Sequence, residues 1–242
     1  MLNRVLITGG GKRIGAALVR AFAELDFEVY IHCHRSQKAA EELRSQLQDP
    51  DRHSIVNIDL SSAERSKYLS ELPPMDLVIN NASCYRLTKA GESESAQNRQ
   101  LYWQVNYFAP LEVIQWQKNS HPGKSLAITM LDCDVLDPAG GVKEFVEAPA
   151  GVDSYLSTRI KLARKLLELA RSNAPQRIAA IAPGPVLPPV NCPTAGMTRI
   201  LDRTVTKRPV GVNEIVNTAL YLWQNPALTG VIIPVDGGMH LQ

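Results

Sequence analysis

A glycine-rich run near the start of the chain contains the residue types that bind a pyrophosphate. Thr8–Gly15 places Gly9, Gly10 and Gly11 directly after a short apolar run. Glycines let a phosphate approach the backbone, and the N-terminus of the helix that follows attracts an anion. Because Ile14 stands where the Gly-x-Gly-x-x-Gly pattern has its third glycine, the run is also compatible with a plain glycine turn. The residues expected to contact a dinucleotide here are Gly9, Lys12, Arg13 and Ile14.

A second group with phosphate-binding chemistry is His34-Arg35-Ser36, at the end of the second apolar run. NAD-binding proteins usually carry an acid at this place for the ribose 2′-hydroxyl, and an acid would repel a 2′-phosphate. The planar guanidinium of Arg35 can pair with that phosphate, while Ser36 and His34 add hydrogen bonds. The alternative is a solvated arginine in a loop. We therefore predict that the chain binds NADPH in preference to NADH.

Metal and thiol chemistry have less support. His32 and His34 share one face of a predicted strand, but the sequence offers no third ligand, so a structural or solvent-facing role is favoured over a metal site. The cysteines lie far apart and form no Cys-x-x-Cys motif; they are Cys33, Cys84, Cys133 and Cys192. We expect free thiols, with neither zinc nor a disulfide framework.

The elements that position these groups follow from hydrophobic periodicity. Short apolar runs alternate with longer segments of helical period, a pattern typical of a parallel sheet covered by helices on both faces. The predicted strands are Arg4–Thr8, Glu28–His32, Ser54–Ile58, Leu77–Asn80, Ser125–Met130, Arg177–Ala182 and Val231–Val235. The predicted helices are Arg13–Leu25, Gln37–Leu47, Ala63–Leu72, Ala96–Gln117, Ser154–Ser172 and Val212–Gln224. The pattern predicts an α/β fold, a single doubly wound Rossmann domain over residues 1–242 with a seven-stranded parallel sheet.

Two segments interrupt the alternation, and both follow predicted strands. Cys133–Asp153 is rich in proline, glycine and acids, and Leu187–Arg208 contains three prolines before a basic end. In open α/β sheets ligands bind at the carboxyl ends of the strands, so long excursions there are expected to form walls of the active site. We interpret 187–208 as a substrate loop.

Composition limits the partners. The chain has 242 residues, of which 26 are Lys or Arg and 24 are Asp or Glu, for a formal charge of +2. Such a balance does not favour nucleic acid or an anionic membrane as a partner. There is no apolar run of the roughly 20 residues that a membrane span needs, and no secretion signal. We expect a cytoplasmic protein with a small-molecule substrate.

Landmarks spread along almost the whole chain occur in a characteristic order. They are Thr8–Gly15, Asp59-Leu60, Asn80-Asn81-Ala82-Ser83, Asn106, Pro183-Gly184 and Asp236-Gly237-Gly238. Together they resemble the short-chain dehydrogenase/reductase family. The resemblance implies a seven-stranded doubly wound sheet, NADPH-dependent oxidoreductase activity, a homotetramer, and a catalytic role for Asn106. It adds as cofactor-binding residues Leu60, Ala82, Pro183, Gly184 and Val186.

Within that family, four features are similar to pteridine reductases, including bacterial dihydromonapterin or dihydrofolate reductases of this fold. They are Arg13 in place of the usual glycine, His34-Arg35-Ser36, the run Asn-Ala-Ser-Cys-Tyr at 81–85, and Asp132 where most relatives have the catalytic serine. By this resemblance Asp59 holds the adenine amine and Asn81 lines the cofactor. Ser83 contacts the nicotinamide phosphate or the pterin, Tyr85 stacks on the pterin, and Arg13 touches pyrophosphate and substrate. The alternative for Tyr85 is a buried core aromatic, and for Asp132 an exposed loop acid.

The same resemblance places the proton donor at Tyr155, near the start of the helix predicted at 154–172. The family normally has a lysine four residues later, where this chain has Arg159; Lys161 lies about 240° around the helix from Tyr155, on the wrong face. A guanidinium keeps the positive charge but cannot relay a proton as lysine can. Asp134 shares a strand face with Asp132 and is an alternative for its role.

Three functions remain open. In the first, hydride passes from NADPH to a pterin C=N carbon, and the ring nitrogen is protonated through Tyr155 with help from Asp132 and Arg159. In the second, a short-chain reductase acts on an unrelated ketone or imine. In the third, Arg159 has largely abolished turnover in a cofactor-binding homologue. NADPH oxidation across pterin and carbonyl substrates distinguishes them.

Overall fold

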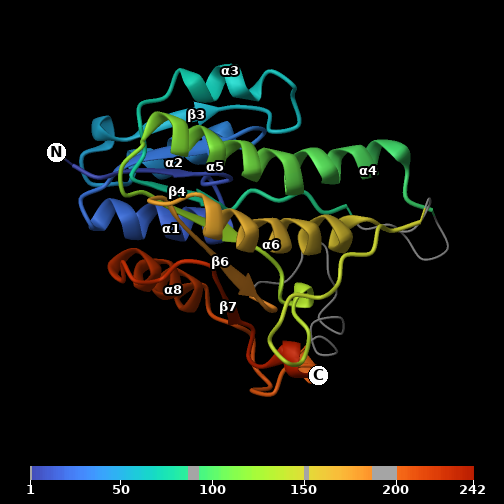
Figure 1. Cartoon of the computed structure of the whole chain (residues 1–242). Helices are drawn as coiled ribbons and strands as arrows, with labels where there is room; N and C mark the ends of the chain where they lie inside the picture. Colours follow the sequence, from blue (N-terminus) through green and yellow to red (C-terminus); the bar gives the residue numbers. More distant parts are fainter. Residues whose placement is uncertain (1, 87–92, 150–152, 187–200) are drawn as a thin grey trace.

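The computed structural model describes residues 2–86, 93–149, 153–186 and 201–242. Seven parallel strands form one sheet in the order β3-β2-β1-β4-β5-β6-β7, with helices on both faces (Figure 1). The strands are β1 (Arg4–Ile7), β2 (Glu28–Cys33), β3 (Ser54–Asn57), β4 (Leu77–Asn80), β5 (Leu126–Met130), β6 (Arg177–Pro183) and β7 (Val231–Val235). The predicted doubly wound α/β fold is confirmed.

The α-helices match the predicted periodic segments, with shifts of a few residues at their ends. They are α1 (Arg13–Glu24), α2 (Gln37–Ser45), α3 (Arg65–Ser70), α4 (Ala96–Trp103), α5 (Ala109–Ser120), α6 (Tyr155–Ser172) and α8 (Val212–Gln224). Short 3-10 turns are η1 (Pro50–Arg52), η3 (Cys133–Val135) and η4 (Met239–Leu241). Among the residues that the structure describes, no helix is long and apolar enough to cross a membrane.

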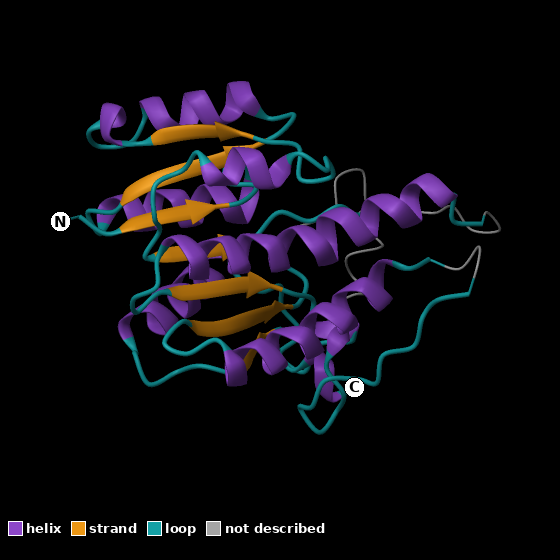
Figure 2. Ribbon diagram, turned by 45° about the horizontal axis from the view of Figure 1, so that its top comes forward, coloured by secondary structure: helices purple, strands orange, loops and turns teal. Residues whose placement is uncertain are grey.

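The order of the strands determines where a ligand-binding crevice is expected. The order reverses beside β1, because β1 pairs with β2 on one side and with β4 on the other. All strands point the same way, so the segments that follow them meet at one edge of the sheet (Figure 2). In doubly wound sheets ligands bind in the crevice at such a reversal.

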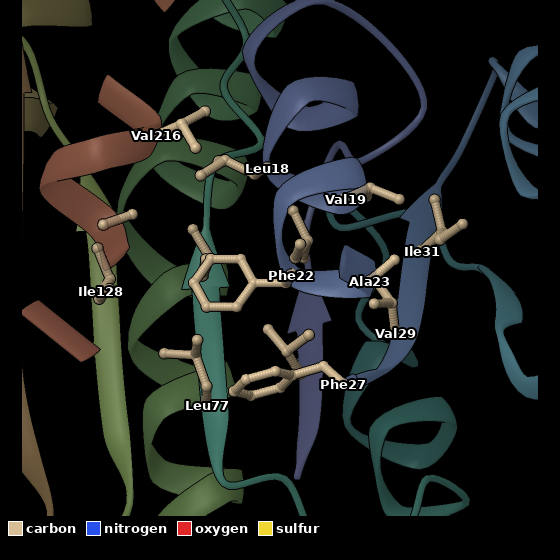
Figure 3. Close-up of a cluster of buried hydrophobic side chains, with 14 of the residues drawn as sticks. Leu18, Val19, Phe22, Ala23, Phe27, Val29, Ile31, Leu77, Ile128 and Val216 are labelled. Carbon is tan, nitrogen blue, oxygen red and sulfur yellow. The ribbon is translucent and has the colours of Figure 1, made fainter. Parts of the chain in front are cut away.

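Two apolar layers hold the sheet rigid. On one face α1, α2 and α8 pack against it, and the rings of Phe22 and Phe27 meet edge-on with centroids 5.1 Å apart (Figure 3). Phe27 also contacts the ring of Trp223 edge-on, at a centroid distance of 5.0 Å. On the other face α3, α5 and α6 cover a second cluster that includes Leu162 and Leu166. Truncating a fully buried phenylalanine such as Phe22 costs about 3–5 kcal/mol of stability. The glycine turn and the start of α1 are therefore anchored to a well-packed core.

The helix predicted at Ala96–Gln117 is interrupted by a π-helical turn, η2 (Gln104–Phe108), between α4 and α5. Pro110 has no N–H to donate to the carbonyl of Asn106, so the regular bonding pattern cannot continue there. The N–H of Ala109 instead bonds the carbonyl of Gln104, five residues back. Such a turn shifts the side chains of one helical turn relative to the next, and π turns frequently occur at functional sites.

The segment after β5 wraps around the outside of two helices. Leu136 and Val142 form an isolated antiparallel bridge, and residues 143–149 then run along α4 and α6. We call 143–149 the strap. Its Phe145 ring lies 4.8 Å from Nζ of Lys161, which also faces the rings of Trp103 and Tyr107. Of the segment interpreted as a substrate loop, residues 187–200 lie outside the described residues.

Candidate active site

The glycine turn between β1 and α1 is held in a shape that demands glycine at two places. Gly9 has a φ of +64°, and a Cβ on Gly15 would lie 2.1 Å from the carbonyl oxygen of Gly9. Arg13 also adopts a left-handed backbone, with a φ of +54°, although it is not a glycine. Such a backbone is strained in a residue with a Cβ, commonly by 1–3 kcal/mol, and strain of this kind clusters at ligand sites. The side chain of Arg13 therefore stands beside the turn at an energetic cost.

His32 supports this turn from below and is not a metal ligand in this arrangement. Nδ1 of His32 accepts the N–H of Gly9 at 3.0 Å, and Nε2 lies 3.0 Å from the carbonyl of Ile58. These two bonds require the neutral ring with its proton on Nε2. Burial lowers the pKa of His32 to about 4, which keeps the ring in that form at neutral pH. The predicted structural role of His32 is confirmed.

Asn81 closes the turn from the neighbouring strand. Its Nδ2 donates to the carbonyls of Thr8 (2.9 Å) and Gly9 (3.2 Å), and its own N–H and that of Ala82 donate to the Thr8 hydroxyl. Asn81 thus joins the ends of β1 and β4 across the strand reversal. The turn is held from two sides, by His32 and by Asn81.

A cavity of about 580 Å³ lies over this turn at the carboxyl edge of the sheet. Most of the residues predicted to bind a dinucleotide line it: Gly9, Lys12, Arg13, Ile14, His34, Arg35, Ser36, Asp59, Leu60, Asn81, Ala82 and Ser83. Its lining is rich in cations, and the adjoining N-terminal turn of α1 carries no acidic residue. Glycine backbone, a helix N-terminus and several cations are the donor set that a dinucleotide with an extra phosphate requires. The residues present fit NADPH.

The far end of the cavity has both basic and acidic groups. His34 Nδ1 lies 3.7 Å from Asp59 Oδ1, and Arg35 is exposed on the same rim. Burial disfavours the charged form of Asp59, but hydrogen bonds from Ser61 and the charges of His34 and Arg35 outweigh it, so the pKa of Asp59 is lowered. Asp59 is therefore an ionised acceptor, suited to an amine such as that of adenine.

Asn106 holds the segment after β4. From the π turn its Oδ1 accepts the backbone N–H of Cys84 at 2.8 Å and lies 3.3 Å from the Ser83 hydroxyl, while Nδ2 donates to the carbonyl of Cys84. Asn106 is fully buried. In this arrangement Asn106 positions Ser83, which lines the cavity.

Tyr155, Asp132 and Ser83 converge beside the cavity from three different elements. The Tyr155 hydroxyl lies 3.5 Å from Asp132 Oδ2, and it also interacts with the Ser83 side chain. The Tyr85 ring packs edge-on against Tyr155 with centroids 4.9 Å apart, and Tyr102 packs against Tyr155 at 5.9 Å. Tyr85 is 56% exposed, so it is not the buried core aromatic of the alternative interpretation.

Burial dominates the proton chemistry of this group. Burial raises the pKa of the Tyr155 phenol; the positive charge of Arg159 lowers it, and the carboxylate of Asp132 raises it further, with a net rise. Burial likewise raises the pKa of Asp132, and the negative charge of Asp134 raises it further. The N–H of Asp134, the charge of Arg159 and the Tyr155 hydroxyl favour the carboxylate, but the net shift of the pKa is upward. Both groups therefore hold their protons to higher pH than free side chains do.

Arg159 lies in the second turn of α6, almost wholly buried at 3% exposure. One of its Nη2 protons bonds the carbonyl of Met130 at the end of β5. Its Nε is buried without a hydrogen-bond partner among the described residues. The guanidinium is thus fixed close enough to Tyr155 and Asp132 for its charge to act on both.

Asp134, the alternative to Asp132, has other partners. It forms an ion pair with Arg203 at 3.0 Å, and its backbone N–H donates to Asp132 Oδ1. Asp132, Cys133 and Asp134 bring three potential metal-ligand atoms within 4.8 Å, but burial and the flanking carboxylates raise the pKa of Cys133 and disfavour a thiolate. The geometry therefore assigns the place beside Tyr155 to Asp132.

Three predicted cofactor residues lie at the end of β6, away from the lining of this cavity as the structure describes it. Pro183 pairs with Val235 in the sheet, and the N–H of Gly184 donates to the carbonyl of Val235. A Cβ on Gly184 would lie 2.7 Å from Cα of Asp236, so glycine is required for close packing there. Val186 is partly buried against the core.

Some lining residues were not anticipated from the sequence. Leu101, Val105 and Arg86 line the cavity, and Tyr102 exchanges hydrogen bonds with the backbone of Arg86. The helical period of 96–117 contains Leu101 and Val105, but the π turn shifts which face points to the cavity. The only sequence signal that Leu101 and Val105 line the cavity was that they closely precede Asn106.

Several known proteins are similar to this chain in sequence and in fold. The family model of the short chain dehydrogenases matches residues 3–119. A dihydromonapterin reductase of Enterobacter sp. is 25% identical, with 98% of this chain and 96% of the relative covered. A 3-oxoacyl-[acyl-carrier-protein] reductase of Chlamydia muridarum is 26% identical, with coverage of 97% and 96%.

Among solved structures, FolM alternative dihydrofolate reductase 1 from Brucella canis, complexed with NADP, is similar, with a TM-score of 0.82 and 29% identity. The alignment covers 99% of this chain and 95% of that one. The family match, the full-length relatives and the shared sheet agree with one another. Residues 3–119 match the short chain dehydrogenases and the whole chain is similar to reductases, so the chain is an oxidoreductase similar to the short-chain dehydrogenase/reductase family.

Proposed function

We propose that the chain is an NADPH-dependent reductase that transfers hydride to a C=N bond of a pterin, either a dihydropterin or dihydrofolate. The observation that carries the proposal is the group formed by Tyr155, Asp132, Ser83 and the exposed ring of Tyr85, next to the dinucleotide cavity. An exposed aromatic ring beside a proton donor suits a flat heterocycle. A small aliphatic ketone would make little use of that ring.

The cofactor assignment rests on the two ends of the cavity. Arg35, Ser36 and His34 line one end, where a 2′-phosphate needs cationic and hydrogen-bonding groups. Beside the other end, Ser83 lines the cavity next to Tyr155, where a nicotinamide must lie for hydride transfer. The similarity to a structure complexed with NADP supports the same assignment.

The chain's own residues supply orientation and the proton. When bound, NADPH supplies the hydride that adds to the carbon of the C=N bond. The Tyr155 hydroxyl donates the proton that the neighbouring ring nitrogen takes up, and Asp132, 3.5 Å away, is placed to exchange a proton with the phenol. Tyr85 holds the ring parallel to the hydride donor, which gives the alignment that hydride transfer needs. Arg159 stabilises the phenolate electrostatically, since it lowers the pKa of Tyr155.

The substrate assignment is tested by following NADPH oxidation with dihydrobiopterin, dihydromonapterin, dihydrofolate and a set of ketones, in the native chain and in Tyr155→Phe. We expect oxidation with at least one pterin or folate, and its loss in the variant. Oxidation with ketones alone would overturn the pterin assignment. Fluorescence changes of NADPH on binding, without oxidation of any substrate, would indicate the cofactor-binding homologue.

We also propose that the chain assembles as a homotetramer through the outer face of η2 and α6. Trp103, Tyr107, Phe108 and Phe145 form a continuous aromatic cluster there, and Phe108 is 44% exposed. Exposed aromatic clusters of this kind are enriched at subunit interfaces. Light scattering on the native chain and on Phe108→Glu measures the mass; a monomeric native chain would refute the assembly.

A further inference from the structure

A buried carboxylate lies next to the start of the helix that carries Tyr155. Glu94 precedes α4 in the chain, and its side chain is entirely shielded from solvent. Its Oε1 accepts both the backbone N–H of Ser154, at 3.0 Å, and the Ser154 hydroxyl, at 2.8 Å. Its Oε2 lies 3.2 Å from Nε of Arg99. Nothing in the reaction proposed above uses Glu94.

These contacts satisfy the start of α6 in place of the usual cap by the N-cap side chain. The first N–H groups of a helix lack partners within the helix, and an anion near them is stabilised by the helix dipole. Ser154 stands at the N-cap position, yet its hydroxyl donates to Glu94 and caps no backbone N–H. Glu94 takes the N–H of Ser154, and Asp153 accepts the N–H of Tyr155 at 2.8 Å. The start of α6 is therefore held by a residue 60 positions away in the sequence.

The same carboxylate connects α6 to the strap. Arg99, paired with Glu94, also donates from Nη2 to the carbonyls of Ala148 (2.8 Å) and Pro149 (2.5 Å). In Figure 1, α4 and α6 run side by side, with their starts toward the same end of the molecule. Glu94 and Arg99 thus join the beginning of α4, the end of the strap and the beginning of α6.

We propose that Glu94 is a positioning residue for the reductase: it fixes the start of α6 so that the Tyr155 hydroxyl stays beside Asp132 and Ser83. The inference rests on the proposed function, in which Tyr155 donates the proton. Tyr155 directly follows Ser154, so any movement of Ser154 is transmitted to the phenol. A displacement of about 1 Å at a reacting group can cost about 100-fold in rate. Glu94 touches neither substrate nor cofactor in this scheme, so its loss acts on the chemical step.

Two substitutions separate hydrogen bonding from charge. Glu94→Gln keeps an oxygen that can accept both Ser154 bonds, whereas Glu94→Ala removes it. We expect Glu94→Ala to lower kcat about 10- to 100-fold while the Kd for NADPH changes less than about threefold. We expect Glu94→Gln to keep most of kcat. An unchanged kcat in Glu94→Ala, or equal losses in both variants, would overturn the proposal.

The matched control is Glu214→Ala. Glu214 also caps a helix N-terminus and pairs with an arginine, since it accepts the N–H of Gly211 at 2.7 Å and binds Arg208 at 2.6 Å, but it does so at α8. We expect kcat to be unaffected in this variant. If Glu94→Ala does not fold, Ser154→Ala tests the same contact by removing only the hydroxyl bond, with an expected loss in kcat of about 3- to 10-fold. No loss of kcat in Ser154→Ala would overturn the proposal.

A second measurement needs no turnover. The phenol of Tyr155 is titrated by near-ultraviolet absorbance, with Tyr155→Phe subtracted in each background. Burial raises the pKa of Tyr155 in the native chain, so release of α6 in Glu94→Ala should move that pKa toward its ordinary value, and Glu94→Gln should not. An unchanged titration in Glu94→Ala would refute the positioning role. Absence of activity in the native chain would instead refute only the proposed function.

Discussion

Replacing Arg35 by glutamate reverses the charge on one rim of the dinucleotide cavity, where the proposed function places the 2′-phosphate. Arg35 lines the cavity together with Ser36 and His34, and it is exposed to solvent. Its charge also acts on Asp59. The substitution therefore removes a cationic partner of the phosphate and adds a like charge beside it, without disturbing the buried core.

The magnitude follows from the exposure of the site. A hydrogen bond to a charged group contributes about 1.5–3 kcal/mol, and near a surface a unit charge about 4 Å away adds between about 1 and 4 kcal/mol. Because Arg35 is solvated, the lower part of these ranges applies, which gives a loss of about 2–3 kcal/mol in NADPH binding. At about 1.4 kcal/mol per tenfold, the Kd rises roughly 30- to 150-fold. NADH has no 2′-phosphate, so its Kd should change by less than about threefold.

The assay is a pair of titrations, NADPH and NADH, followed by coenzyme fluorescence at one fixed ionic strength. Arg20→Glu is the control, because Arg20 is an exposed arginine on α1 that bonds Gln46 outside the cavity. We expect Arg20→Glu to leave both Kd values nearly unchanged. Equal losses for NADPH and NADH in Arg35→Glu would refute the 2′-phosphate assignment. So would an equal loss in the control.

Three further predictions concern proton-bearing groups. Tyr155→Phe should lower kcat about 100-fold or more while the Kd for NADPH is retained, and unchanged turnover would exclude the phenol as the acid. Burial raises the pKa of Asp132 in the folded chain above its ordinary value of 3.8, so between these two pKa values the native state binds more protons than the unfolded chain. Stability therefore falls as the pH rises through that interval. Asp132→Asn should raise Tm at pH 7 and lower kcat. His32 has a native pKa of about 4 against an ordinary 6.5, so stability is lost as pH falls between these values, and His32→Gln should flatten that dependence of Tm; an identical acid dependence would contradict this.

The fold was predictable because its signal is local. Each strand is a short apolar run, and each helix has a 3.6-residue period, so both can be read without any knowledge of tertiary contacts. Val231–Val235 and Leu77–Asn80 match their predicted bounds, and β1 ends one residue before the predicted end. The interruption at Gln104–Phe108 was not predicted, since the apolar pattern of 96–117 continues across the π turn.

The site was less predictable where it depends on contacts between distant segments. The sequence left Asp132 and Asp134 as alternatives, and only the fold separates them, because Arg203 pairs with Asp134 while Asp132 faces Tyr155. Glu94 has no local motif to mark it. Its importance arises from a bond to Ser154, 60 residues away, which no periodicity encodes.

The arginine at 159 can be understood from its surroundings. A lysine at this position would carry a charge and an exchangeable proton, whereas a guanidinium carries the charge and keeps its proton. Bonded to the carbonyl of Met130, Arg159 still lowers the pKa of Tyr155, so the electrostatic half of the lysine role is preserved. In the proposed reaction Asp132 performs the proton exchange that a lysine would perform. That carboxyl lies 3.5 Å from the phenol, and burial raises its pKa, so it is the neighbour of Tyr155 best able to return a proton.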